Sequence, residues 1–402
     1  MNKIVVGIDV AKGKSMVAAV EQSLKILVRP YQTQHGDSDL KALARKLKRM
    51  GGEVRAVMES TGHYHEPITK ILHEAGIYVS VVNPYLVKIF GNNTLRKVKT
   101  DKADAVRIAR YGMHYWRELR RWTPADDARV RLKEINRQFC FYAERKFAQQ
   151  DHLVSLLDRT FPAARALFNT RIKANGQIKW VDFAETFWHC DIINQMDEDE
   201  FIEIYRVWCR EHFYEFSRAK AAEIYRRSFG HVCTMPKNSH TEALVTAAAR
   251  QTSAISQEVE SLRGELCALA AQLPEHPAVT GLFGASETVA AQLMAEIGDV
   301  RNYKNGKALV AFAGVDPGRD QSGASDRRSV AITKNGSRRL RKSLTSAVEC
   351  CIMCRPPGDP VYAFYKQKRD EGKHFYVCRV AAVNKFLRIY YARVKEYLNG
   401  VD

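Results

Sequence analysis

Hydrophobic and polar positions in the first 115 residues alternate in a way that predicts short strands and helices. Residues 3–10 place Ile4, Val6 and Ile8 on one face, as a strand does. Short turns after this strand favour antiparallel hairpins. We predict strands at 3–10, 15–21, 25–31, 53–58 and 77–82, and helices at 39–50, 66–75 and 101–112. This order predicts an α/β fold, a mixed sheet with flanking helices.

Two longer stretches follow the period of a helix. In residues 125–158, apolar side chains recur every three or four residues from Leu132 onward. In residues 241–273, steps of four and three residues alternate, which is the heptad pattern of a coiled coil. Such helices either pack on each other as an antiparallel pair or mediate dimerisation. Residues 159–240 between them are rich in aromatic side chains and carry no functional motif. Further helices are predicted at 287–297, 306–313, 337–351 and 375–398, with a loop at 314–329.

Together these patterns predict three domains in the 402-residue chain. They are a mixed-sheet domain at 1–121, long coiled-coil helices at 122–273 with the aromatic-rich insertion at 159–240, and a mostly helical domain at 274–402. No apolar run approaches the roughly 18 residues of a membrane span, and no cleavable signal pattern follows the first strand. The nine cysteines are an odd number, which favours free thiols. We therefore expect a cytoplasmic protein without a membrane partner.

Charge adds information about partners. Lys and Arg number 63 against 45 Asp and Glu, a formal net charge of +18, which indicates a polyanion such as nucleic acid or an anionic membrane surface. The bases concentrate at 88–121, where aromatic residues interleave with them, and at 327–342, which contains no acid. A solvated helix face is the alternative for the first stretch. Candidate phosphate contacts are Arg96, Lys97, Lys99, Lys102, Arg107, Arg327, Arg328, Lys334, Arg338, Arg339 and Arg341.

Four carboxylates occupy matching positions in the predicted sheet domain. Asp9 ends the first strand, Glu59 follows the strand at 53–58, and Asp101 and Asp104 share one face of a helix start. Taken singly, each could be a solvated strand end or a partner of the helix dipole. If all four meet at one sheet edge, they repel each other unless a divalent cation is present. Oxygen ligands suit Mg²⁺ or Mn²⁺, and two such ions can clamp a phosphoryl displacement.

Several motifs together resemble one known family. They are Gly7-Ile8-Asp9-Val10-Ala11-Lys12, Glu59-Ser60-Thr61-Gly62, Lys99-Thr100-Asp101-Lys102-Ala103-Asp104-Ala105, Ala295-Glu296-Ile297-Gly298-Asp299, Ala311-Phe312-Ala313-Gly314-Val315, Gln321-Ser322-Gly323 and Thr333-Lys334-Asn335-Gly336-Ser337-Arg338-Arg339-Leu340-Arg341. In this order they resemble the DEDD-type insertion-sequence transposases and the related Piv-type DNA invertases. The resemblance covers about the first 115 and the last 120 residues. It implies a RuvC-like, RNase H-like N-terminal domain and a C-terminal transposase domain.

The resemblance also implies an activity. The implied enzyme is a recombinase that cuts and rejoins donor and target DNA. Its metal ligands would be Asp9, Glu59, Asp101 and Asp104. Ser322 would attack the DNA phosphate and form a phosphoserine link, since a serine hydroxyl activated by metal or base is a competent nucleophile. Family members are guided by a structured noncoding RNA and act as oligomers, so a guide RNA and a homodimer or homotetramer are expected. Ser325 and Ser329 are weaker candidates for the nucleophile.

Three other functions are alternatives to this one. A metal-dependent nuclease of the Holliday-junction type would use the same carboxylates without a covalent intermediate. An actin-like ATPase also has a Gly-x-Asp on its first strand, but the sequence lacks its second phosphate hairpin and its Gly-rich adenosine motif. A nucleic-acid-binding protein without activity would explain the charge and leave the carboxylates unexplained.

Two further clusters contain residue types that bind metals. Cys351, Cys354, His374 and Cys378 have zinc-like spacing, but a helix end and a turn separate them, which favours ordinary packing or surface thiols. His63 and His65 follow Glu59 closely, and contact with the metal site or a phosphate is the alternative to a surface position.

Overall fold

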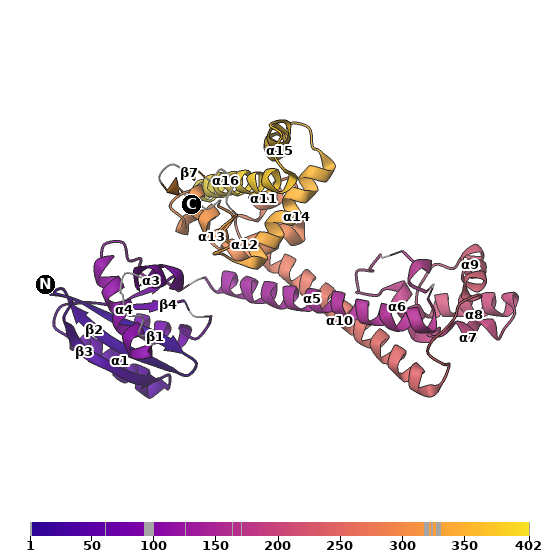
Figure 1. Cartoon of the computed structure of the whole chain (residues 1–402), viewed down its shortest axis with the longest axis horizontal. Coiled ribbons are helices and arrows are strands. Elements are labelled where there is room, and N and C mark those ends of the chain that lie inside the picture. Colours follow the sequence, from indigo (N-terminus) through magenta and orange to yellow (C-terminus); the bar gives the residue numbers. More distant parts are fainter. Residues whose placement is uncertain are drawn as a thin grey trace. The chain divides into compact units, whose positions relative to one another are not determined.

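The computed structural model describes residues 2–60, 62–91, 100–124, 126–162, 164–169, 171–316, 321–322, 325–326 and 331–401, with the backbone alone at 321, 322, 325, 326 and 401. Two compact units make up the chain, Met1–Ala125 and Asp126–Asp402 (Figure 1). Each has its own buried core.

The first unit is built on a five-stranded sheet. Its strands are β1 (Lys3–Ala11), β2 (Lys14–Glu21), β3 (Ile26–Gln34), β4 (Glu53–Glu59) and β5 (Tyr78–Val82), in the order β3-β2-β1-β4-β5. β2 is antiparallel to both β1 and β3, whereas β4 is parallel to β1 and β5 is parallel to β4. The predicted mixed sheet is confirmed, with the strand order and directions of an RNase H-like domain.

Helices cover both faces of this sheet. α1 (Asp37–Lys48) and α2 (Glu66–Glu74) share one core with alternate residues of β1 such as Ile4 and Ile8. α3 (Pro84–Gly91) and α4 (Asp101–His114) share another core with Val5 of the same strand. Because side chains alternate along a strand, the two cores lie on opposite faces. The central position of β1 explains why six of its nine residues are buried.

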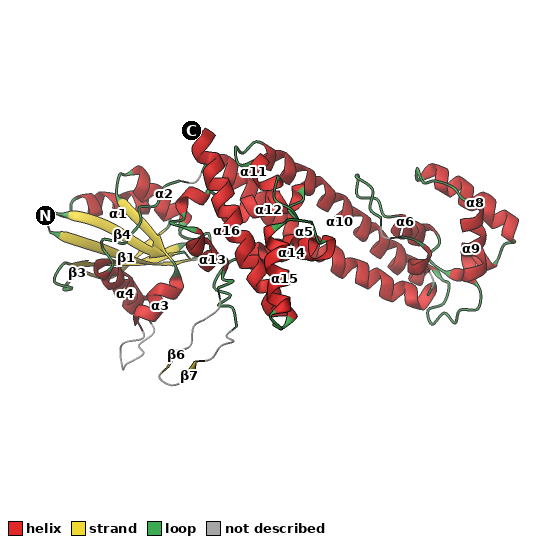
Figure 2. Cartoon of the chain, turned by 90° about the horizontal axis from the view of Figure 1, so that it is seen from above, coloured by secondary structure: helices red, strands yellow, loops and turns green. Residues whose placement is uncertain are grey.

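A pair of long helices forms the frame of the second unit. α5 (Asp127–Thr160) and α10 (Ser239–Ala271) lie side by side in Figures 1 and 2. Lys146 Nζ lies 4.0 Å from a carboxylate oxygen of Glu260, and the amide of Gln149 donates to Gln251 over 3.2 Å. Since later residues of α5 meet earlier residues of α10, the pair is antiparallel. This is the first of the two arrangements predicted for these helices.

The segment between the long helices is a small helical module with an aromatic core. It comprises η1 (Ala164–Leu167), α6 (Lys179–Thr186), α7 (Cys190–Asn194), α8 (Glu198–Glu211) and α9 (Arg218–Ser228). Phe183, Phe187, Phe201, Tyr205 and Trp208 are buried against one another. Aromatic contacts of this kind add to the free energy gained from burial. The aromatic residues seen in the sequence are therefore the core of this module.

The remaining chain packs at the other end of the helix pair. Its elements are α11 (His276–Thr280), α12 (Glu287–Ile297), η2 (Val300–Asn302), α13 (Gly306–Ala313), β6 (Gln321–Ser322), β7 (Ser325–Asp326), α14 (Arg338–Cys354), α15 (Pro360–Asp370) and α16 (Phe375–Val401). Its core includes Leu132 of α5 and Leu266 of α10. The predicted helical C-terminal part is confirmed. Among the helices of the described residues, none has the length and apolar character needed to cross a membrane.

Candidate active site

Asp9 and Glu59 lie at the same edge of the sheet. β1 and β4 are parallel neighbours whose register pairs Ile8 with Met58, so the next residues along the two strands are Asp9 and Glu59. Asp9 was expected to end its strand but lies within β1, two residues before its last residue, whereas Glu59 is the last residue of β4; the residues just before each carboxylate are buried. The sheet topology therefore brings together two carboxylates that are fifty positions apart in the sequence.

The start of α4 supplies Asp101 and Asp104. Thr100 caps this helix by accepting a hydrogen bond from the amide of Ala103 over 3.3 Å. α4 runs closely against β1, because a β-carbon at Gly7 would lie only 2.1 Å from the carbonyl oxygen of Ala105. Glycine is therefore required at this point of the strand.

We expect Gly7→Ala to destabilise the first unit. The added methyl group would meet helix backbone that cannot move without displacing α4, so the free energy of unfolding should fall by about 3 kcal/mol. Thermal or denaturant unfolding of the full chain measures this effect. Gly51→Ala is the matched control, because a β-carbon there meets nothing within 4 Å. Equal stability of the two variants would contradict the close approach of α4 to β1.

The four carboxylates act on one another electrostatically. The pKa of Asp9 is raised to about 6, first by burial and then by the charges of Asp104 and Asp101, while the charge of Arg107 lowers it. Burial also raises the pKa of Glu59, with contributions from Asp9 and Asp104. A concentration of negative charge that holds protons at mildly acidic pH is typical of a site that binds cations.

Arg107 belongs to this cluster. Its guanidinium forms an ion pair with Asp104 one helical turn earlier, and its charge lowers the pKa of both Asp9 and Glu59. We predicted Arg107 as a phosphate contact, and sequence reasoning missed its role as a counter-ion to the carboxylates. The spacing of three residues on one helix was the signal that could have indicated the pair.

The spacing of these carboxylates is wider than that of a preformed ligand cage. In the described part of the chain, one set of three or more His, Cys, Asp or Glu side chains has all its donor atoms within 4.8 Å of each other. That set is His189, Cys190 and Cys233, and it does not include the four carboxylates. Like charges are expected to stand apart until a cation lies between them. Neither His63 nor His65 is among the groups that shift the pKa of Asp9 or Glu59.

Ser322 lies on a two-stranded hairpin in the second unit. β6 and β7 pair Gln321 with Asp326 and Ser322 with Ser325. The return of the chain from this region is anchored, because Thr333 donates to Asp316 through its amide over 3.2 Å and through its hydroxyl over 2.7 Å. A sequence predicted simply as a loop thus includes a hairpin whose flanking residues are fixed to the end of α13.

The turn after the hairpin is held equally firmly. A β-carbon at Gly336 would lie 2.0 Å from the carbonyl oxygen of Phe312, so this turn lies directly on the last residues of α13. Arg341 donates to the carbonyl oxygens of Ala313 and Gly336 over 3.2 and 2.8 Å. Arg341 therefore stabilises the turn, which is a role that sequence reasoning did not predict.

The other candidate phosphate contacts differ in exposure. Lys102 is exposed on α4, and Lys334, Arg338 and Arg339 are exposed at and before the start of α14. Ser337 caps α14 and also donates to buried Glu296 over 2.6 Å, which fixes the orientation of this basic helix start. The remaining candidates, Arg96, Lys97, Lys99, Arg327 and Arg328, lie outside the described residues.

The zinc-like spacing near the C-terminus corresponds to ordinary packing. Buried Cys351 donates to the carbonyl oxygen of Phe283 over 3.3 Å, and Cys378 donates to that of Lys373 over 3.4 Å. Cys354 lies 4.0 Å from Cys350 at an exposed helix end. These thiols contact backbone or each other instead of converging on one point.

Comparison with known proteins defines the class to which these features belong. One family model, described as a transposase and named for the DEDD residues of IS110 elements, matches residues 6–162. A second, described as "Transposase IS116/IS110/IS902 family", matches residues 277–363. The chain is thus a transposase, an enzyme that cuts and rejoins DNA. It belongs to the IS110 family of transposases and DNA invertases.

Individual relatives span different shares of the chain. The pilin gene-inverting protein of Moraxella bovis is 22% identical over 98% of this chain and 97% of its own length. The transposase for insertion sequence element IS1533 of Leptospira borgpetersenii is 32% identical over 29% of this chain and 32% of its own length. The structure of T. thermophilus RuvC in complex with a Holliday junction substrate aligns with 29% of this chain and 96% of that chain, at 16% identity and a TM-score of 0.23.

Proposed function

We propose that the chain is the recombinase of an insertion sequence and that it cleaves DNA at a divalent-cation centre formed by Asp9, Glu59, Asp101 and Asp104. The observation that carries the proposal is the mutual effect of these carboxylates, whose burial and charge raise the pKa of Asp9 to about 6. Carboxylates that are buried close together repel each other and destabilise the folded chain, and such groups are typical of functional sites. Their oxygen ligands suit Mg²⁺ or Mn²⁺.

The residues of this centre have different roles. Asp9 and Glu59 are fixed by neighbouring strands, so their separation is set by the sheet. Asp101 and Asp104 are oriented by the Thr100 cap and by the packing of α4 on Gly7. Arg107 pairs with Asp104 and orients its carboxylate. A bound Mg²⁺ or Mn²⁺ would polarise the scissile phosphate and stabilise the charge that develops during displacement.

We further propose Ser322 as the nucleophile. Its oxygen would form a bond to phosphorus while the bond from phosphorus to the bridging DNA oxygen breaks, and the serine proton would pass to that leaving oxygen. Attack by the hydroxyl of a second strand would then reverse the step and restore Ser322. The family resemblance of Gln321-Ser322-Gly323 and the anchoring of its flanks by Thr333 support this assignment. A phosphoester to serine conserves the energy of the broken bond, so rejoining needs no further cofactor.

The proposed partners are donor DNA, target DNA and a guide RNA. The net charge of +18 suits polyanions, and the family resemblance supports the RNA and a homodimer or homotetramer. The chain purified from its host should carry a structured RNA transcribed from DNA beside its own gene, which sequencing of the copurified RNA would identify. Recovery of unrelated cellular RNA alone would contradict RNA guidance.

The proposed function is tested with DNA that carries the ends of the element and with the copurified RNA. Mg²⁺ or Mn²⁺ should produce a covalent protein–DNA adduct and recombinant product, and a chelator should abolish both. Cleavage that continues in the chelator would contradict a cation centre. Cleavage without any adduct would instead favour a nuclease that uses water as its nucleophile.

We expect the exposed bases at the start of α14 to contact phosphates. Replacing both Arg338 and Arg339 by Ala should weaken binding of DNA and lower the slope of log affinity against log salt by about 2. Fluorescence anisotropy between about 50 and 200 mM salt measures this slope. The matched control replaces Arg206 and Arg210, which are exposed on α8, and should leave the slope unchanged. Equal slopes for both double variants would contradict the assignment.

A further inference from the structure

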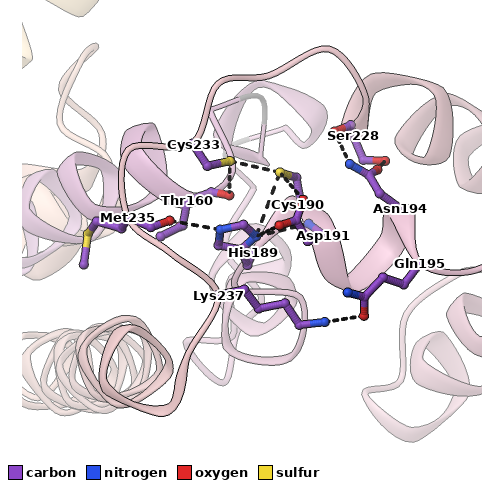
Figure 3. Close-up of polar contacts among 10 residues, drawn as sticks. All are labelled: Thr160, His189, Cys190, Asp191, Asn194, Gln195, Ser228, Cys233, Met235 and Lys237. Carbon is purple, nitrogen blue, oxygen red and sulfur yellow. Dashed lines mark hydrogen bonds and ion pairs between the residues drawn. The ribbon is translucent and has the colours of Figure 1, made fainter.

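The helical module between the long helices brings three metal-binding side chains together. His189 and Cys190 are both 2% exposed, and Cys233 is half-buried. A ring nitrogen of His189 and the Sγ atoms of Cys190 and Cys233 all lie within 4.8 Å of one another, and Nδ1 is 4.0 Å from Sγ of Cys190 (Figure 3). Cys233 is 43 residues away from Cys190, so the fold and not a local motif creates the cluster.

The histidine is held in the form that binds a metal. Nε2 of His189 lies 3.1 Å from the carbonyl oxygen of Met235, and a contact with a carbonyl requires the ring to donate its proton there. The lone pair is then on Nδ1, which faces the cysteines and accepts the amide of Asp191 over 3.1 Å. A backbone carbonyl that fixes the ring in this way is the usual outer partner of a metal-binding histidine.

The carboxylate of Asp191 lies beside this group, near two of its three members. One carboxylate oxygen lies 3.5 Å from Nδ1 of His189, and the other lies 3.8 Å from Sγ of Cys190. Its side chain is half exposed, so it stands on the solvent side of the three other groups. Two sulfurs and one nitrogen converge here, with a carboxylate beside them, and these are ligand types of tetrahedral zinc.

The distance between the two sulfurs distinguishes this cluster from a disulfide. Cys190 Sγ and Cys233 Sγ are 3.0 Å apart, whereas a disulfide bond is about 2.05 Å long. Two thiolates on one zinc ion lie about 3.8 Å apart, given a metal–sulfur distance of about 2.3 Å, so zinc requires them to separate slightly.

The cluster joins three parts of the chain. Cys233 donates to the carbonyl oxygen of Thr160, the last residue of α5. The amides of Thr234 and Met235 both donate to the carbonyl oxygen of Arg159. His189 and Cys190 stand at the start of α7. A metal ion at this point would fasten the segment before α10 to the end of α5 and to the aromatic module.

We propose that His189, Cys190, Cys233 and Asp191 bind one Zn²⁺ ion, which fixes the aromatic module to the ends of the long helices. Three donors are already together, and a small turn of the Asp191 side chain would complete four protein ligands, the composition of a structural zinc site. Binding releases the two thiol protons and replaces the hydrogen bond from the Asp191 amide to Nδ1. The proposal is independent of the carboxylate centre, which is in the other unit of the chain.

The test is the metal content of the full-length chain, purified under reducing conditions without chelator. Mass spectrometry of the metals should find one zinc ion per chain, and Cys190→Ser and Cys233→Ser should each lose it. The matched control replaces Cys350 and Cys354, whose sulfurs are 4.0 Å apart, and should retain the zinc. Asp9→Asn should also retain it, which separates this site from the proposed active site.

A second measurement applies if the cysteine variants fail to fold. Metal-free wild-type chain titrated with Co²⁺ should develop the visible absorption of a tetrahedral site and a charge-transfer band from sulfur to cobalt, saturating at one ion per chain. Wild-type chain that contains no zinc and develops neither absorption would overturn the proposal. A disulfide between Cys190 and Cys233 would also overturn the proposal. It would be detected as an intact mass lower by two hydrogens and as a cross-linked peptide that contains both cysteines.

Discussion

Asp9→Asn should abolish recombination and at the same time make the metal-free chain more stable. Asn retains the shape of Asp9 but carries no charge, so it removes a cation ligand and also the repulsion among the carboxylates. Loss of a ligand to a catalytic cation costs several kcal/mol of transition-state stabilisation, a fall in rate of at least about a thousandfold. Product formation on element-end DNA, with Mg²⁺ and guide RNA present, measures the first effect.

The second effect follows from the pKa of Asp9. Its value in the folded chain is about 6, above the ordinary 3.8, so the folded chain binds more protons between these values. Stability of the metal-free chain therefore falls as pH rises from about 4 through 6 and stays lower above that range. A pKa difference of this size corresponds to about 3 kcal/mol, and partial exposure of Asp9 reduces it.

We accordingly expect Asp9→Asn to raise the free energy of unfolding by about 1 to 2 kcal/mol at pH 8 and to have little effect at pH 4. Denaturant unfolding in the presence of a chelator measures both values. Glu59→Gln should act in the same direction, because the pKa of Glu59 is also raised. A destabilising effect of Asp9→Asn at pH 8 would show that this carboxylate has a structural role instead.

Ser322→Ala should bind nucleic acid like the wild-type chain and yield no covalent adduct with DNA. The substitution removes only the proposed nucleophilic oxygen, so phosphate contacts from the basic residues should persist. Recombination should fall to the level of the uncatalysed background, because no energy-conserving intermediate can form. A denaturing gel of the reaction with labelled DNA detects the adduct directly.

Ser325→Ala is the matched control for Ser322→Ala. Ser325 lies opposite Ser322 in the β6–β7 hairpin, so both substitutions alter the same local structure. The control should form the adduct at a normal rate. If the adduct persists in Ser322→Ala, or if peptide mapping places it on another residue, Ser322 is not the nucleophile. Cleavage that continues in Ser322→Ala without any adduct would favour a two-metal mechanism with water.

Much of the fold could be predicted because helix boundaries are encoded locally. Residues 287–297 were predicted as a helix with the bounds that the structure has, since Ser286 caps its start and Gly298 ends it with a positive φ of 69°. α3 and α15 were missed, and both begin with proline, at Pro84 and Pro360. A first helical position needs no amide proton, so a proline there is compatible with the start of a helix.

The candidate sites differ in how far the sequence could reveal them. Asp9 and Glu59 could be brought together because hairpins and crossover helices determine which strands are neighbours. The ion pair of Asp104 with Arg107 was missed because a basic stretch suggested phosphate contacts. The cluster of His189, Cys190 and Cys233 was also missed, because it depends on how the segment before α10 packs on the end of α5.

The most direct test of the cation centre is calorimetry at pH 7.5. Bound Mg²⁺ and Mn²⁺ are first removed from the full-length chain, and either ion is then titrated into it. We expect saturable binding that weakens below pH 6, where protons occupy Asp9, by up to about tenfold per pH unit. We also expect Asp9→Asn to abolish this binding at pH 7.5. Binding of equal affinity and stoichiometry in the wild-type chain and in Asp9→Asn would contradict the central claim.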